Sequence, residues 1–405
     1  MSNHYEPNAV ATARSMDPTR VSAWIATKKY WYLLSLIIPA LPIVCAYFAV
    51  ESGNGLWLWA TVVFFYAGIT LLDSVFGDDE ANPTEEMVET LKNESYYKYV
   101  LYAAVPMLWL SIVAMAYVVS HYEWSWFSIL GGALSAGLMG AFGVNLGHEL
   151  GHKVNDKGQQ LAAKLALATC GYGHFVIEHN KGHHKDVATP DDPASSRMGE
   201  SIYKFVRREI PGAFRRAWAL EAARLQRQGK SEWSFENEII QPALLTIAVY
   251  SVLLAFFGPI MLPFLLIVAF FGYWNLTCAN YIEHYGLLRQ KDKNGRFERC
   301  QPHHSWNSNH KISNLFVVHL QRHSDHHAHP TRAYQVLRDY DNVPKLQAGY
   351  PWMFILAMIP PVWFALMNPR VVEWAQGDLN KVNVDPDLKD SLFARYHQTE
   401  QASQP

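Results

Sequence analysis

The stretch WSWFSILGGALSAGLMGAFGVNLGHELGH, residues 124–152, decides the fold of this chain. Its first part, Trp124–Gly147, carries no charged side chain, and about 20 apolar residues are enough for a helix to cross the hydrocarbon core of a membrane. His148 and His152 follow directly at i, i+4 spacing, which puts both imidazoles on one face of a helix. The stretch therefore predicts a membrane-spanning helix that ends in a pair of histidines suited to chelation.

Five other segments are equally apolar. One charge-free run, Gln241–Ile282, is divided by Gly258 and Pro259 into two helix-sized halves. We predict an all-α integral membrane protein with six transmembrane helices. The expected spans are about residues 31–50, 55–76, 99–120, 124–147, 242–258 and 261–282. The shorter run Trp352–Met367, interrupted by Pro360-Pro361, is predicted to be interfacial or re-entrant.

Positive charges are distributed unevenly between the connecting segments. The short turns 51–54 and 121–123 lack Lys and Arg, whereas the N-terminal segment, with Arg14, Arg20, Lys28 and Lys29, and residues 148–240 and 283–405 carry nearly all of them. The positive-inside bias then places both termini in the cytoplasm. The first apolar run is expected to be a retained anchor, because no small-residue cleavage site follows it. Residues 148–240 and 283–405 should form a mostly helical cytoplasmic cap.

The composition of the chain limits the kinds of ligand and reaction that it can support. The chain is 50% hydrophobic and 17% charged with a net charge of −2, so it offers no basic field for nucleic acid. Eighteen histidines stand against four cysteines, and no C-x-x-C pair occurs. Metal or acid–base chemistry is therefore expected to use imidazole, with no disulfide framework and no four-cysteine iron site.

Histidines gather in four clusters, two of them attached to span ends. Besides HELGH, they are EHNKGHH at 178–184, the end of the sixth span at NYIEHYG, and LQRHSDHH at 320–327. Repeated chelating spacing predicts a metal centre. The candidate ligands are His148, His152, His179, His183, His184, His284, His323, His326 and His327. For His174, His303, His304, His310, His319 and His329 we favour structural roles or roles behind the ligands.

Nine imidazoles exceed one coordination sphere, so two ions are implied, and zinc, copper, iron and nickel all suit imidazole. The literal H-E-x-x-H of His148–His152 keeps a membrane zinc metalloprotease open, with Glu149 as its general base. A transporter lined by histidines is a third interpretation. The span centres lack histidine, which argues against it.

The boxes HELGH, EHNKGHH and LQRHSDHH, together with NYIEHYG, resemble the integral-membrane histidine-box di-iron enzymes, which include fatty acyl desaturases, hydroxylases and alkane monooxygenases. GYGHF, DVATP, RMGESIYKF, REIPGAF, PHHSWNSNH and HAHPTRAYQ are similar to the alkane monooxygenases in particular. The resemblance covers most of the chain. It implies a single fatty-acid-desaturase-like domain over residues 1–405 in a bacterial inner membrane.

The resemblance also implies an activity. The nine histidines would hold two iron ions, and O2 would deliver one oxygen atom to the terminal methyl group of an n-alkane taken from the bilayer. A related desaturase or hydroxylase is the alternative within the same architecture. Because the chain has neither a G-x-G-x-x-G fingerprint nor a four-cysteine site, we expect no bound flavin, haem or nicotinamide and a separate electron donor. The resemblance identifies this donor as rubredoxin, reduced by an NAD(P)H-dependent reductase, and cations between Lys181 and Arg227 are candidates for docking it.

Two further sets of residues are proposed around the centre. Ligand histidines are usually oriented by carboxylates, and the candidates are Asp325, Glu283 and Glu149. Asp73 lies at the end of the second span, where burying a charged side chain costs free energy. Residues expected to line the alkane channel are Phe65, Gly68, Ile69, Leu138 and Phe142, with Phe65 as the chain-length stop.

Overall fold

The structure is a computed structural model that describes residues 18–402. Between these residues every named element is a helix, and the only extended pairings are isolated bridges, which confirms the all-α prediction. The predicted basic segment around Arg14 lies outside the described residues.

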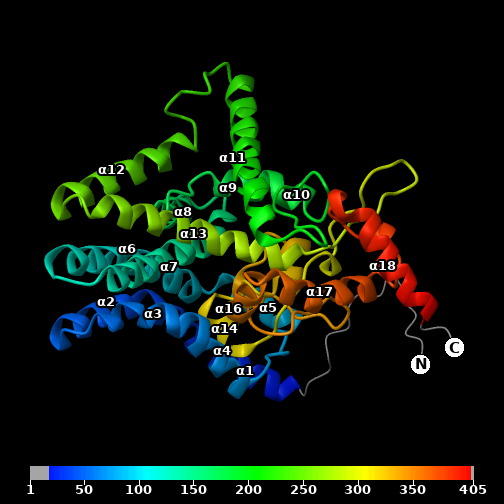
Figure 1. The fold of residues 1–405 in the computed structure, drawn as a ribbon, viewed down its shortest axis with the longest axis horizontal. Coiled ribbons are helices and arrows are strands. Elements are labelled where there is room, and N and C mark those ends of the chain that lie inside the picture. Colours follow the sequence, from blue (N-terminus) through cyan, green and yellow to red (C-terminus); the bar gives the residue numbers. More distant parts are fainter. Residues whose placement is uncertain (1–17, 403–405) are drawn as a thin grey trace.

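Six helices in the described part of the chain are long and apolar enough to span a membrane, as predicted. They lie side by side in Figure 1. The first span combines α1 (Pro18–Trp31), η1 (Tyr32–Leu36) and α2 (Ile37–Ser52). The second combines η2 (Gly55–Trp59), α3 (Ala60–Val63), the π-helical η3 (Phe64–Gly68) and α4 (Ile69–Phe76). The others are α6 (Ser95–His121), α7 (Trp126–Gly151), α12 (Ile240–Phe257) and α13 (Met261–His284).

The first span begins earlier than expected, and two of its lysines are paired. The apolar helix starts at Ser22 rather than near residue 31. Lys28 is buried against Asp79, and Lys29 binds Glu94. Both carboxylates belong to the acidic segment 77–98, which contains α5 (Glu85–Asn93). The helix can extend through these lysines because their charges are neutralised.

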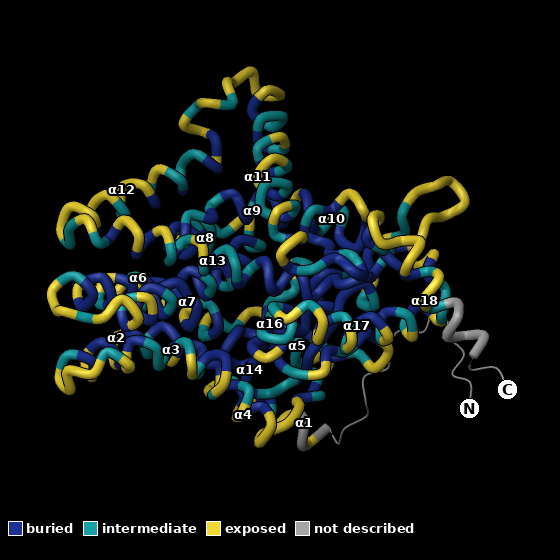
Figure 2. Tube along the Cα trace, in the orientation of Figure 1, coloured by how far each residue is buried: buried dark blue, intermediate teal, exposed yellow. Residues whose placement is uncertain are grey.

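Helix α7 occupies the centre of the bundle because its surface is made of small residues. A Cβ atom at Gly140 would lie 2.8 Å from the Cβ of Cys170 and 3.4 Å from the Cα of Gly272 on α13. Such contacts let helix backbones approach closely, which is how helices associate in lipid. Figure 2 shows the centre of the bundle buried and α12 largely exposed.

The remaining elements collect at one end of the spans, where α7 and α13 both end (Figure 1). They are α8 (Lys157–Leu167), α9 (Phe175–Glu178), the π-helical η4 (His179–His183), α10 (His184–Asp186), α11 (Ile202–Arg227), η5 (Pro302–His304), α14 (Lys311–Phe316), α15 (His323–Ala328), η6 (Tyr334–Val336), η7 (Leu379–Lys381), η8 (Pro386–Leu388) and α18 (Lys389–Ala402). Within this mostly helical cap, α14 and α15 are separated by a break in the backbone. Val318 and His319 have positive φ angles, and the His319 N–H bonds the Asn314 carbonyl.

The run around Pro360-Pro361 forms two helices, α16 (Tyr350–Ala357) and α17 (Pro360–Trp374), bent by 114°. The bend follows from the two prolines, which remove two N–H groups and cannot continue α16. The interfacial or re-entrant placement of this segment stays a prediction.

Candidate metal centre

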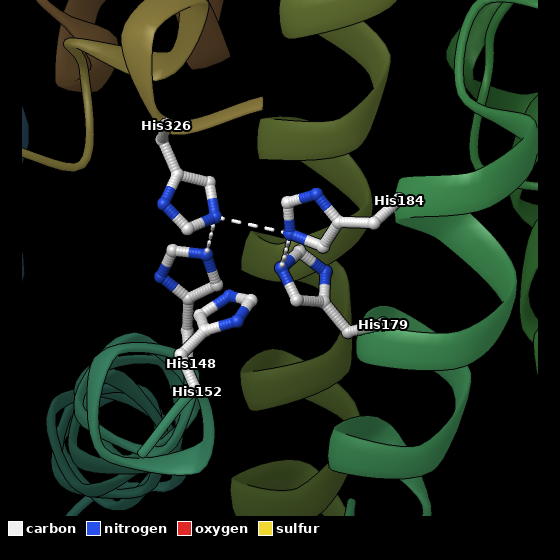
Figure 3. A group of neighbouring side chains, drawn as sticks. All are labelled: His148, His152, His179, His184 and His326. Atoms are coloured by element: carbon white, nitrogen blue, oxygen red, sulfur yellow. Dashed lines mark hydrogen bonds between the residues drawn. The ribbon is translucent and has the colours of Figure 1, made fainter. Parts of the chain in front are cut away.

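The structure brings all nine candidate histidines together at the cap end of the bundle, in two groups. The first contains His148, His152, His179, His184 and His326, and the second contains His183, His284, His323 and His327. Within each group the ligand nitrogens all lie within 4.8 Å of one another. Figure 3 shows the five rings of the first group converging from the end of α7, from residues 179–184 and from α15.

Hydrogen bonding cannot account for the first group. His326 Nε2 lies 2.8 Å from His148 Nε2 and 3.1 Å from His184 Nε2, which in turn lies 3.0 Å from His179 Nε2. A ring nitrogen of a neutral imidazole carries either one hydrogen or one lone pair, so it makes a single hydrogen bond. Two nitrogens 2.1 Å from one ion and 90° apart are about 3.0 Å apart. The spacing therefore fits nitrogens that share an ion.

The second group is arranged in the same way. His323 Nε2 lies 2.8 Å from His327 Nε2, and the Nε2 atoms of His183 and His284 are buried without a partner. The two groups adjoin, since the ring centroids of His184 and His327 are 4.5 Å apart. The residues present thus fit two neighbouring ions, each surrounded by imidazole nitrogens.

Burial keeps the rings ready to bind a metal. Seven of the nine histidines are at most 7% exposed, while His152 and His184 are partly exposed. Burial lowers the pKa of His179, His326 and His327 well below the ordinary value, because a charged ring loses its hydration. Neutral imidazole is the form that binds a metal ion.

A π-helical turn explains how the second cluster serves both groups. His179 and His183 have the spacing of a pair on one α-helical face, but residues 179–183 form the π helix η4. In that turn His184, five positions after His179, approaches it, and their Nε2 atoms are 3.0 Å apart. His183 instead joins the second group.

Two ligand candidates are oriented from behind. His183 Nδ1 lies 2.9 Å from Asp192 Oδ2, and His284 Nδ1 lies 3.4 Å from the His304 carbonyl. Each contact takes the hydrogen at Nδ1 and leaves the Nε2 lone pair facing the group. Burial lowers the pKa of His183, but the Asp192 carboxylate outweighs burial and raises it overall. Asp192 is a residue that the sequence analysis missed, because nothing in TPDDPASS distinguishes it from its neighbour Asp191.

The three predicted orienting carboxylates have different positions. Glu283 Oε2 lies 3.1 Å from His323 Nε2. Asp325 instead accepts bonds from Arg332, from Tyr340 Oη and from the N–H of Arg338, so it anchors the following loop. Its carboxylate bonds none of the nine rings among the contacts described.

Glu149 is turned toward the Tyr334 N–H and Lys153 rather than toward the rings, and its neighbours His148 and His152 share their group with three other histidines. The geometry therefore contradicts the zinc protease alternative, because a zinc protease needs Glu149 beside a metal that is held by three protein ligands.

The histidines for which other roles were expected lie outside both groups. Tyr32 Oη lies 3.1 Å from His319 Nε2. His303, His304 and Glu298 form a third cluster. There, His304 Nδ1 accepts the Gln301 N–H, so Nε2 carries the hydrogen and faces Glu298 Oε1 at 3.3 Å. Asp73 is also structural, since its Oδ1 accepts the N–H groups of Ile312 and Ser313 at the start of α14.

An apolar cavity leads to the rings. Of the predicted channel residues, Phe65 and Phe142 line it in an edge-to-face pair. Gly68, Ile69 and Leu138 are not among its lining residues; Ile69 and Leu138 are fully buried in the core, and Gly68 lies against Phe64. Lining residues that the sequence analysis missed include Asn145, Asn275, Asn280, Tyr350 and Phe354. The cavity also reaches His148, His179 and His323.

Fold and site together define a class of protein: a polytopic helical membrane protein whose histidines build a candidate two-ion metal centre at one end of the bundle. An apolar cavity joins this centre to the interior of the spans.

The comparisons identify the family. Residues 124–365 match the fatty acid desaturase family. The chain is 54% identical to an alkane 1-monooxygenase of Pseudomonas putida over 92% of both chains. It is 52% identical to alkane 1-monooxygenase 1 of Alcanivorax borkumensis over 92% of this chain and 93% of the relative. A hydroxylase component of a xylene/toluene monooxygenase of P. putida is 29% identical over 60% of this chain and 64% of its own. The chain belongs to the fatty acid desaturase family and, within it, to the alkane 1-monooxygenases, which are oxidoreductases.

Proposed function

We propose that this protein hydroxylates the terminal methyl group of n-alkanes with O2, using two iron ions held by the nine histidines. The observation that carries the proposal is the apolar cavity, which ends at His148, His179 and His323. Relatives named alkane 1-monooxygenase support the substrate class. An n-alkane dissolves in the bilayer, so a cavity within the spans gives it a water-free route to the centre.

The chain's residues have separable roles in this reaction. When bound, two irons would supply the redox chemistry that zinc lacks. Asp192 holds the hydrogen of His183 at Nδ1, so that Nε2 binds. Phe65 and Phe142 keep water from the alkane and limit its position. The net reaction consumes one alkane, one O2, two electrons and two protons, and it yields one alcohol and one water.

The two electrons are proposed to come from rubredoxin, which is in turn reduced by an NAD(P)H-dependent rubredoxin reductase. We also propose that residues 1–405 form one domain in a bacterial inner membrane, with both termini and the metal centre facing the cytoplasm. The distribution of Lys and Arg supports this orientation.

Metal analysis and alkane turnover on one detergent-purified sample test the proposal. The sample is assayed with octane, rubredoxin, its reductase and NADH, and the products are separated by gas chromatography. Two irons per chain and 1-octanol are expected. Two irons without alcohol would point to a desaturase or to another hydroxylase substrate, and one zinc without iron would overturn the di-iron assignment. His326→Ala should lose iron and activity, whereas His303→Ala, a histidine outside both groups, should keep both.

A further inference from the structure

Helix α16 lines the cavity without belonging to any of the six candidate spans, as do the cap elements α9, η4 and α15. It packs against α13 on one side and against η3 and α4 of the second span on the other, and Figure 1 shows it between them. Tyr350 and Phe354 point into the cavity, while Trp352, on the opposite face, is 41% exposed. One face of α16 therefore lines the cavity, and the other is apolar and exposed where lipid is expected.

The second span and α13 also meet directly, farther from the histidines. Tyr66 Oη donates to Asn275 Oδ1 at 2.8 Å. Asn275 is nine residues before His284 on α13, which corresponds to about 13 Å along a helix. Between this contact and the metal centre, α16 covers the seam between the two spans.

The two ends of α16 are held differently. At its start, the Tyr350 N–H bonds Gln321 Oε1 at 2.9 Å. A Cβ atom on Gly349 would lie 2.5 Å from Asp73 Oδ2, so this end is tightly packed. These contacts fix the start of α16 to the cap.

The other end of α16 has no helical continuation. Pro360 and Pro361 have no N–H groups to bond the last carbonyls of α16. The carbonyl of Met358 instead accepts a bond from Tyr203 Oη of α11 at 2.8 Å. Beyond the break, α17 is fixed by Trp363, which is fully buried against Tyr281 and Tyr285. The break at Met358–Ile359 is thus a hinge, held by the Tyr203 side chain in addition to the backbone bonds from the Ile359 N–H to the Leu356 carbonyl and from the Trp363 N–H to the Ile359 carbonyl.

We propose that α16 forms the entrance through which an alkane passes from the bilayer into the cavity. We also propose that the entering alkane displaces the side chain of Phe354. The inference rests on the proposed function, since it concerns the same cavity. Phe65, which also lines the cavity, would act differently if it is the predicted chain-length stop: it would limit how long a chain fits. A residue at the entrance changes kcat/KM for every alkane, whereas a residue that limits chain length changes kcat/KM for long alkanes more than for short ones.

Substitutions that change the size of residue 354 test this difference. The purified holoenzyme with Phe354→Ala or Phe354→Trp is assayed on hexane, octane, dodecane and a branched alkane. Phe354→Trp is expected to lower kcat/KM roughly tenfold for all linear alkanes alike, with little change in kcat. Phe354→Ala should raise kcat/KM most for the branched substrate. Trp352→Ala, on the other face of α16, is the matched control and should leave all values unchanged. Iron content shows whether each variant retains the centre.

If the loss of kcat/KM in Phe354→Trp grows with the chain length of the alkane, Phe354 limits chain length and the proposed entrance at α16 is wrong. Unchanged kcat/KM in both Phe354 variants, with wild-type turnover intact, would overturn it as well. Failure of the wild type to form any alcohol would instead count against the proposed function. Tyr203→Phe, which removes the hydrogen bond to Met358, adds an independent arm. It should raise kcat/KM for the branched alkane in the same direction as Phe354→Ala, and an unchanged value would argue against the hinge.

Discussion

At the scale of single residues, the contact between Asp192 and His183 links the candidate metal centre to the cap. Asp192 is fully buried, and besides His183 it accepts bonds from Ser195 Oγ at 2.7 Å and from Arg216 Nη2 at 2.7 Å. Arg216 also binds Glu178, beside His179. A change at Asp192 therefore reaches ligand candidates of both groups.

Asp192→Asn should weaken metal binding about 10- to 100-fold, because the amide no longer provides a charge that holds the hydrogen at His183 Nδ1. The measurement is iron per chain after dialysis against graded chelator concentrations, with circular dichroism as a check of the fold. Asp186→Asn is the control, since Asp186 approaches Arg216 only at 3.6 Å. Equal iron retention in both variants would contradict the role assigned to Asp192.

Glu209 on α11 gives a pH prediction. Its carboxylate is buried, accepting bonds from Thr277 Oγ1 and Asn280 Nδ2, and burial raises its pKa to about 7 from 4.5. Because the pKa of Glu209 is higher in the folded state than in the unfolded state, the protonated carboxyl stabilises the fold at low pH. This contribution is lost as the pH rises through about 7. The wild type should lose about 2 kcal/mol of unfolding free energy between pH 5 and 8 relative to Glu209→Gln. Thermal unfolding of both proteins in detergent across this range measures the difference, and parallel curves would refute it.

At the scale of elements, the crossing of α7 and α13 sets the distance between the histidines at their ends. The crossing depends on Gly140 and Gly272, which meet over Cys170. A Cβ atom at Gly272 would lie 2.7 Å from the Cβ of Cys170 and 3.3 Å from the backbone of Gly140. No larger side chain fits there without moving a helix.

Gly272→Leu should therefore separate α7 from α13, destabilise the protein by roughly 1–3 kcal/mol and reduce bound iron. The midpoint of thermal unfolding and the iron content are measured together. Ala255→Leu adds similar bulk on the exposed face of α12 and should change neither. Comparable behaviour of the two variants would show that the helix crossing does not control the site.

At the scale of the whole molecule, the nine histidines tie together four separate segments: the end of α7, residues 179–184, the end of α13, and α15. Ions bound by all of them would stabilise the folded state, because the unfolded chain offers no assembled site.

Removing metal by chelation should lower stability by about 4 kcal/mol for each bound ion, relative to protein with free Fe²⁺ at a thousand times its Kd. Limited proteolysis should then cut the cap first, near residues 285–310, where helix is sparse among the described residues. Adding Fe²⁺ back should restore protection. Identical cleavage with and without metal would mean that the ions do not hold the cap together.

The sequence determined the elements whose signals are local. Long uncharged runs such as Trp124–Gly147 identify spans because a helix must cross a hydrocarbon layer of fixed thickness. The nine histidines were identifiable because chelation requires imidazoles at short spacing, and the Pro360-Pro361 pair predicted the bend between α16 and α17.

Tertiary structure decided the features that depend on distant contacts. A π-helical turn, rather than the i, i+4 spacing, assigned His179 and His183 to different groups. Asp192 rather than Asp325 faces a candidate ligand ring, and Phe354 on α16 joins Phe65 around the cavity. These outcomes depend on packing between segments that are far apart in the sequence. The spacing of residues along the chain does not determine that packing.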